Sequence, residues 1–303
     1  MNGKLKPRHA ILGLGFLLAV ITAASGVAAT VSQWHDDSPV TREVFGNVPS
    51  ALRLAFYVVL PVLFVYGAVL FAQRADNWQR GRPDRRATTT ANAKRRFGDV
   101  RAGLYMQTLL RDPAAGVMHS LIYFSFLILL AVTTVLEVNH QVPEGMKFLH
   151  GQVYEAYSFV GDAAGLMLVA GTLWAIARRY GPRRMRPYRI RIKSRPEHAV
   201  ILGVLLGLGL TGFLAEMFRI AVDGRPRFEV WSFVGYPLSW LVRDVGSVHG
   251  WHQVMWITHV VTFCAFLVIL PTTMLRHMFT SPLNMYLKDR ERPKGAMKPL
   301  PDL

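Results

Sequence analysis

The 303-residue sequence has almost no cysteine: Cys264 stands alone, inside an apolar stretch. One cysteine cannot form a disulfide within the chain or supply the thiolate sets that iron–sulfur clusters and structural zinc sites need. Acidic residues are also scarce, because 19 Asp and Glu accompany 35 Lys and Arg. The sequence therefore excludes an iron–sulfur cluster built from this chain's cysteines and leaves a strongly basic protein to explain.

Long apolar stretches account for most of the hydrophobic residues, which make up 51% of the sequence. A helix of about 20 residues spans the roughly 30 Å hydrocarbon core of a bilayer. Backbone polar groups must be satisfied within such a segment, so each stretch is predicted to be a helix. We therefore predict an all-α, polytopic transmembrane helical bundle of about six helices, at 10–29, 51–72, 114–138, 159–177, 199–222 and 254–275.

The positive charge is concentrated in alternate connecting segments. The N-terminal tail, the segments after the second and fourth stretches, and the C-terminal tail hold 28 of the 35 Lys and Arg residues. This asymmetry is the positive-inside pattern, and it predicts that both termini are cytoplasmic. The basic surface is then explained by topology and by attraction to anionic lipid rather than by nucleic-acid binding.

The first apolar stretch, at 10–29, has two interpretations. Its basic start and the small residues "AASGVAAT" are typical of a secretory signal. The apolar run is longer than the core of a usual signal, which favours a retained helix. Cleavage would leave five helices in the same orientation.

Histidines at both ends of the last stretch are the strongest functional pattern. His259 and His277 are 18 residues apart, so on one continuous helix they share a face and lie about 27 Å apart. An ionisable side chain in a membrane segment indicates function, and neutral imidazole is the usual axial ligand of haem iron. The pattern predicts one haem ligand near each membrane surface.

A second helix must provide the opposite ligands. His119 lies at the cytoplasmic start of the third stretch, at the depth expected for His277. At the outer end, His140 lies about 31 Å further along, near the depth of His259, and His150 is a competing candidate. We expect His119, His259 and His277 to bind haem iron. The remaining histidines are expected to cap helices or to lie at the interface: His9, His35, His198, His249 and, at the outer rim, His252.

Other polar residues lie within the apolar stretches. Glu216 and Arg219 are three residues apart on one helix face and are expected to pair. They form either a structural ion pair or part of a quinone pocket, or they contact a haem propionate. Glu137 and Asp162 have similar standing, and Asp162 alternatively orients an imidazole. Four glycines favour close helix packing, or close approach of a macrocycle: Gly203, Gly207, Gly209 and Gly212.

Two segments resemble a known family. "HGWHQVMWITHVVTFCAFLVILPTTMLRHMFTSPLN" resembles the last helix of the cytochrome b family typified by the gamma subunit of respiratory nitrate reductase, which carries two haem-ligating histidines 18 residues apart. "RDPAAGVMHSLIYFSFLILLAVTT" resembles that family's ligand-bearing second helix. The resemblance implies a five-helix cytochrome b core, preceded here by an N-terminal helix, with a proximal haem held by His119 and His277. Leu129 replaces the family's next histidine, so this chain binds one haem, or uses His140 or His150.

Three further segments resemble a particular branch of that family. "GQVYEAYSFVGDAAGLMLVAG", "TGFLAEMFRIA" and "HMFTSPLNMYLKD" are similar to the branch linked to heterodisulfide-reductase-type iron–sulfur proteins, which includes the electron-transfer-flavoprotein:menaquinone oxidoreductases. The resemblance implies a bacterial inner (plasma) membrane protein with menaquinone as substrate. It also implies a cytoplasmic iron–sulfur partner or C-terminal domain, with electron-transfer flavoprotein as a candidate donor.

Together these patterns predict a quinone-linked oxidoreductase subunit that holds one or two b haems. Its parts would be an N-terminal helix and outer loop at 1–50, a cytochrome b-like domain at 51–287, and a cytoplasmic tail at 288–303 that leads to or contacts the partner. Two alternatives are a haem-free anchor for a peripheral redox protein and a small transporter. A transporter is expected to have repeat symmetry and broken midplane helices, and the sequence has neither.

Overall fold

The structure is a computed structural model that describes residues 40–78, 80, 89–105, 107, 109–182 and 194–287, together with positions 16 and 20. Apart from positions 16 and 20, the helix predicted at 10–29 lies outside the described residues, as do most of the second basic segment and the tail at 288–303. The described residues form helices and no strand.

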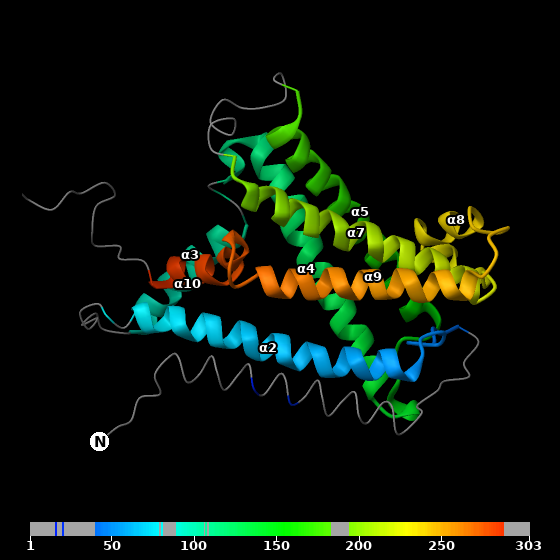
Figure 1. Ribbon diagram of the computed structural model, residues 1–303. Coiled ribbons are helices and arrows are strands. Elements are labelled where there is room, and N and C mark those ends of the chain that lie inside the picture. Colours follow the sequence, from blue (N-terminus) through cyan, green and yellow to red (C-terminus); the bar gives the residue numbers. More distant parts are fainter. Residues whose placement is uncertain are drawn as a thin grey trace, which may run out of the picture. The chain divides into compact units, whose positions relative to one another are not determined.

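Five long helices make up most of the fold (Figure 1). Each is long and apolar enough to cross a membrane. They confirm five of the six predicted spans and are compatible with a multi-pass membrane protein. Their bounds are α2 Ser50–Trp78, α4 Pro113–Gln141, α5 Gly151–Tyr180, α7 Pro196–Val222 and α9 Val248–Ile269.

Short helices occupy the connections. The segment between α7 and α9 contains the 3₁₀ turn η4, Arg227–Trp231, and the short helix α8, Gly235–Trp240, neither of which is long enough to span a membrane. The other short elements are α3 Thr90–Leu104, η1 Leu109–Arg111, η2 Glu144–Met146, η5 Met274–Arg276 and α10 His277–Leu287.

The chain divides into two compact units. The larger comprises Met1–Gly81 and Val117–Leu275, and the smaller comprises Arg82–Gly116 and Arg276–Leu303. Within the smaller unit α10 packs on α3, where the Arg96 guanidinium lies 5.5 Å from the centre of the Tyr286 ring. Phe97 meets the same ring edge-on.

Helix α7 is central to the larger unit, because it packs along both α5 and α9, and α2 packs on α9. A Cβ atom added at Gly207 would lie 3.2 Å from Cγ2 of Thr262 on α9. One added at Gly209 would lie 2.6 Å from Cγ2 of Val169 on α5. These approaches confirm that glycines of α7 allow close helix packing.

The last span differs from its prediction. We expected one helix over 254–275 with His259 and His277 on a common face, but α9 ends at Ile269 and His277 begins α10. Pro271 follows that end and has no N–H with which to continue the helical bonding. Thr273 donates both its backbone N–H and its hydroxyl to the carbonyl of Ile269. The common-face argument is therefore wrong, although His277 stays a predicted ligand.

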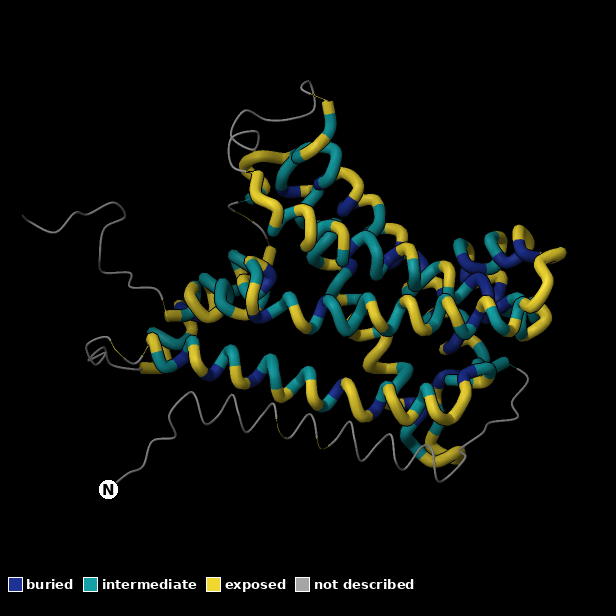
Figure 2. Tube along the Cα trace, viewed as in Figure 1, coloured by how far each residue is buried: buried dark blue, intermediate teal, exposed yellow. Residues whose placement is uncertain are grey.

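Burial is uneven along the larger unit. Figure 2 shows buried positions gathered near α8, while single buried positions are interspersed among exposed and intermediate ones along α2. We call this region the α8 end: it contains η4, α8, the C-terminus of α7 and the N-termini of α5 and α9. The exposed apolar side chains of α2, such as Val58 and Val62, suit contact with lipid. The α8 end instead buries polar groups, and such groups need hydrogen-bond or ion-pair partners within the protein.

Candidate functional site

His259 lies on α9 against the middle of α7. Its Nδ1 is 2.9 Å from the Thr211 hydroxyl, and that hydroxyl donates to the Gly207 carbonyl one turn earlier, at 2.6 Å. A Cβ atom at Gly212 would lie 3.4 Å from Cε1 of the imidazole, so the absent side chain makes room for the ring. Helix α9 carries no Asp, Glu, Lys or Arg. The imidazole is thus positioned by neutral groups in an apolar helix pair.

His252, seven residues earlier on α9, has a different environment. It is buried, and its Nδ1 lies 3.1 Å from Nδ2 of Asn47. The same Asn47 amide donates to the backbone carbonyl of His249 at 2.8 Å, and Gln253 donates to the backbone carbonyl of Asn47 at 3.0 Å. These bonds tie the segment before α2 to the first turns of α9. His252, which was predicted at the outer rim, is therefore buried among hydrogen bonds that join two segments near the start of α9.

The two candidates for an outer ligand are separated by their burial. His140 is buried in the last turn of α4, where Phe45 meets its ring edge-on at 5.4 Å. Phe45 also contacts Trp256 of α9, with ring centres 6.0 Å apart. His150 is exposed at the N-cap of α5. The structure thus buries His140 against Phe45, which in turn contacts α9, and leaves His150 at the surface.

The predicted cytoplasmic pair belongs to two different units. His119 is on α4 in the larger unit, with its ring stacked at 6.4 Å on Tyr123 one turn later. His277 is the exposed first residue of α10 in the smaller unit. Their joint ligation of one iron remains a prediction.

Of the histidines expected to cap helices, His198 does so: its Nδ1 accepts from the backbone N–H of Arg195 at 3.0 Å, at the start of α7. His249 is exposed on α9. His9 and His35 lie outside the described residues.

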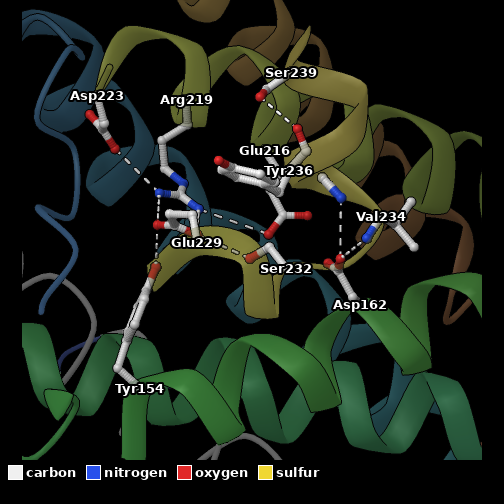
Figure 3. Close-up of polar contacts among 11 residues, drawn as sticks. Tyr154, Asp162, Glu216, Arg219, Asp223, Glu229, Ser232, Val234, Tyr236 and Ser239 are labelled. Atoms are coloured by element: carbon white, nitrogen blue, oxygen red, sulfur yellow. Dashed lines mark hydrogen bonds and ion pairs between the residues drawn. The ribbon is translucent and has the colours of Figure 1, made fainter. Parts of the chain in front are cut away.

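Arg219 lies at the centre of a buried ionic network at the α8 end (Figure 3). Its guanidinium donates two bonds to the Glu229 carboxylate, at 2.6 and 3.1 Å. The hydroxyls of Tyr154 and Ser232 donate to the same carboxylate, at 2.8 and 3.1 Å. Asp223 at 3.2 Å is a more exposed partner of Arg219. Three elements, α5, α7 and η4, are therefore joined through one carboxylate.

Glu216 pairs with Arg219 as predicted, but only at 3.9 Å. Its carboxyl packs on Gly235, where a Cβ atom would come within 2.6 Å of it. Asp162 accepts from the backbone N–H groups of Val234 and Gly235, at 2.6 and 3.2 Å. Among the described residues Asp162 has no imidazole partner, so it holds the start of α8 instead.

Glu229 is outside the membrane-spanning helices, and its ionisation can be argued from its neighbours. Burial alone would raise the pKa of this carboxyl. The positive charge of Arg219 and the bonds from Arg219 and Tyr154 outweigh that effect, and the pKa of Glu229 is lowered. The carboxylate is thus the ionised partner of Arg219 in the network.

Sequence reasoning missed the partners of these residues. Glu229 lies ten residues after Arg219 in a polar connection, and Thr211 is one hydroxyl in an apolar helix. Asn47 lies in the segment before α2, more than 200 residues from His252 along the chain. Glu137 of α4, which had the same standing as Glu216, accepts at 2.8 Å from the Tyr57 hydroxyl on α2. No group of three or more His, Cys, Asp or Glu among the described residues could hold a metal ion by itself.

Two curated proteins are similar to this chain. The "EtfAB:quinone oxidoreductase" of Syntrophomonas wolfei is 23% identical over 267 residues, which cover 84% of this chain and 36% of that protein. The "Probable iron-sulfur-binding oxidoreductase FadF" of Bacillus subtilis is 23% identical over 186 residues, which cover 60% of this chain and 25% of that protein. The chain therefore spans about a third or less of each relative. No protein-family model matches it, and no solved structure matches it. The similarity supports an oxidoreductase-related family.

Proposed function

We propose that this chain is the haem b-containing membrane part of a respiratory oxidoreductase and passes electrons between an iron–sulfur partner and menaquinone. His259 carries the proposal: it is an imidazole in a helix with no charged residue, and it is positioned by a neutral hydroxyl on the adjacent helix. A polar side chain in such a place is costly unless it is used. The similarity to a protein named as a quinone oxidoreductase supports a redox use over transport.

The residues present suit a haem. His259 offers an imidazole nitrogen as a donor, and Gly212 of α7 makes room for its ring. When bound, haem b would supply a one-electron carrier between the iron–sulfur partner and quinone. The chain's own part is to supply axial nitrogens, with His119, His259 and His277 as proposed ligands and His140 or His150 as the fourth. His140 is favoured, because it is buried against Phe45, a residue that also contacts Trp256 of α9, while His150 is exposed.

Glu216 and Arg219 remain the proposed wall of a quinone pocket. Glu216 lies five residues after Thr211 on α7, which corresponds to about 8 Å along the helix axis. Its ion pair with Arg219 is long, whereas Arg219 itself is tied to Glu229. Glu216 also lies beside Asp162. Among the described residues Glu216 has no ion pair as short as that of Arg219 with Glu229, so we propose it as the member of the pair that contacts a ligand.

The proposed setting follows from charge and from the relatives. With the basic segments in the cytoplasm, both chain ends face the cytoplasm of a bacterial inner membrane. An iron–sulfur protein, separate or fused, would then deliver electrons on that face, with electron-transfer flavoprotein as a candidate donor. Attraction to acidic partner surfaces and anionic lipid would favour the same face.

A dithionite-reduced-minus-oxidised spectrum of purified membranes tests the proposal. We expect a b-type signal in the wild type and its partial or complete loss in His119→Ala and His277→Ala. His198→Ala is the matched control, because that imidazole caps α7 through the backbone of Arg195. A colourless wild-type protein would indicate a haem-free anchor, and an unchanged spectrum in both ligand variants would reject the cytoplasmic assignment.

A further inference from the structure

The hydrogen bonds around Thr211 specify where its single hydroxyl proton lies. Its Oγ1 is 2.6 Å from the carbonyl oxygen of Gly207. Two oxygens approach this closely only when a proton lies between them, and a backbone carbonyl has no proton to give. The hydroxyl proton therefore points along α7 toward Gly207, and Oγ1 presents lone pairs to its other neighbour.

That other neighbour is Nδ1 of His259, at 2.9 Å. Since the hydroxyl proton is already used, Nδ1 must be the donor in this contact. A neutral imidazole carries one N–H, so a proton on Nδ1 leaves Nε2 with its lone pair. Among the described residues the His259 ring has no other hydrogen bond.

Thr211 is also stiff enough to hold the ring in one orientation. Threonine is branched at Cβ, and the bond to the carbonyl four residues earlier favours one side-chain rotamer. Gly212 lies against Cε1 of the same imidazole, so the ring meets α7 at two adjacent positions.

We propose that Thr211 is the positioning residue of His259: its hydroxyl oxygen accepts from Nδ1, which fixes both the tautomer and the ring orientation and leaves Nε2 as the atom that coordinates haem iron. This inference rests on the proposed function. Hydrogen bonds from a ligating histidine's second nitrogen set ligand basicity, and their loss typically weakens metal binding by about 10- to 100-fold. A neutral acceptor such as a hydroxyl raises the electron donation of the imidazole, and its removal is expected to raise the midpoint potential of the haem.

Three variants separate this role from simple packing. Thr211→Val keeps the branched shape but removes the acceptor, and Thr211→Ser restores it. Thr262→Val is the matched control: Thr262 also lies in the contact between α7 and α9, beside Gly207, but its hydroxyl donates to the carbonyl of Thr258. We expect Thr211→Val to lose haem or to show a raised midpoint potential and an altered low-spin haem signal in electron paramagnetic resonance. Thr211→Ser and Thr262→Val are expected to match the wild type.

The tautomer itself can be measured without haem. In haem-free protein in bilayers, ¹⁵N chemical shifts of His259 are expected to report a protonated Nδ1 and an unprotonated Nε2, and Thr211→Val should mix the two forms. A proton on Nε2 in the wild type, or a Thr211→Val protein with wild-type potential and spectrum, overturns the inference. The expected tautomer in a wild-type protein that binds no haem overturns the proposed function and leaves the hydrogen bond standing.

Discussion

His252 and His259 both lie on α9, but one faces a hydrogen-bond donor and the other faces an acceptor. Asn47 approaches His252 with an amide nitrogen, which can only donate, so Nδ1 of His252 accepts and its proton lies on Nε2. Asn47 is assigned in this orientation because the same nitrogen also donates to a backbone carbonyl. Thr211 presents His259 with a lone pair, which places the proton on Nδ1. Two histidines seven residues apart on one helix thus offer different nitrogens to a ligand.

The difference shows that sequence position and burial are not enough to choose a ligand. Both histidines lie on α9, and burial favours His252. The partners decide the question, because His252 would have to give up its Nε2 proton to bind a metal through that nitrogen, whereas His259 already presents a lone pair there. A histidine in a membrane helix can therefore join two segments or bind a metal, and the chemistry of its neighbour distinguishes the two.

The largest expected effect is on haem content, when His259 and His252 are replaced in turn. His259→Ala should remove one b-type signal from the reduced-minus-oxidised spectrum, because the iron would lose an axial nitrogen. His252→Ala should keep that signal and lower thermal stability modestly, by about 1 kcal/mol for one lost hydrogen bond. Haem content per protein and the unfolding temperature of both variants are the measurements. Loss of haem in His252→Ala with retention in His259→Ala would reverse the comparison.

The second effect concerns the network at the α8 end, which we expect to be structural at Glu229. Glu229→Gln leaves the Arg219 charge buried without its main counter-charge, and breaking such a buried pair costs about 3–5 kcal/mol. Thermal unfolding in detergent should show this loss while the haem signal of the folded protein is retained. Asp223→Asn is the matched control, because Asp223 is an exposed partner of the same guanidinium and should matter little.

The ionisation of Glu229 also predicts how the stability of the folded protein changes at low pH. The pKa of Glu229 is lowered in the folded protein, so its contribution is present above the unfolded pKa of a glutamate, about 4.3. That contribution is lost as the pH falls through the lower, folded value. Wild-type stability should decline below about pH 4 more steeply than that of Glu229→Gln. Parallel acid profiles for the two proteins would contradict an ionised Glu229 in the network.

The sequence was sufficient to predict those features of the fold that depend on a single physical rule. The apolar length of each stretch predicted five helices that the structure contains, and the spacing of Glu216 and Arg219 predicted their pairing. It failed at the end of α9, where the apolar run continues past Ile269 but the backbone does not stay helical. Pro61 lies inside α2, so proline alone does not end a helix. After α9, Met274 instead binds the Glu197 carboxylate through its backbone N–H, a long-range bond that periodicity cannot predict.

At the candidate site, too, the sequence alone could not predict contacts between residues far apart in the chain. The sequence indicated His259 from its place in an apolar stretch, but it indicated neither Thr211 nor Asn47, because their roles depend on which helices become neighbours. The partner of Arg219 was missed for the same reason, since Glu229 reaches it only after the chain turns back through η4. The sequence indicated residue types that could bind a cofactor, whereas the groups that orient their side chains could be identified only from the packing of the helices.

The smallest expected effect tests the packing that brings α7 to its neighbours. Gly209→Ala would place a Cβ atom 2.6 Å from a methyl group of Val169, a branched side chain that cannot easily move. Overpacking of this kind costs about 1–3 kcal/mol. Gly203→Ala is the matched control, since among the described residues no atom beyond the local backbone of α7 lies within 4 Å of its added Cβ. The higher helix propensity of alanine should leave stability equal or slightly raised. Because Gly209 faces α5 and His259 lies on α9, Gly209→Ala should lower the unfolding temperature without shifting the haem potential. A shift in potential would mean that the α5 contact also positions His259, and the ring would then depend on more than Thr211 and Gly212.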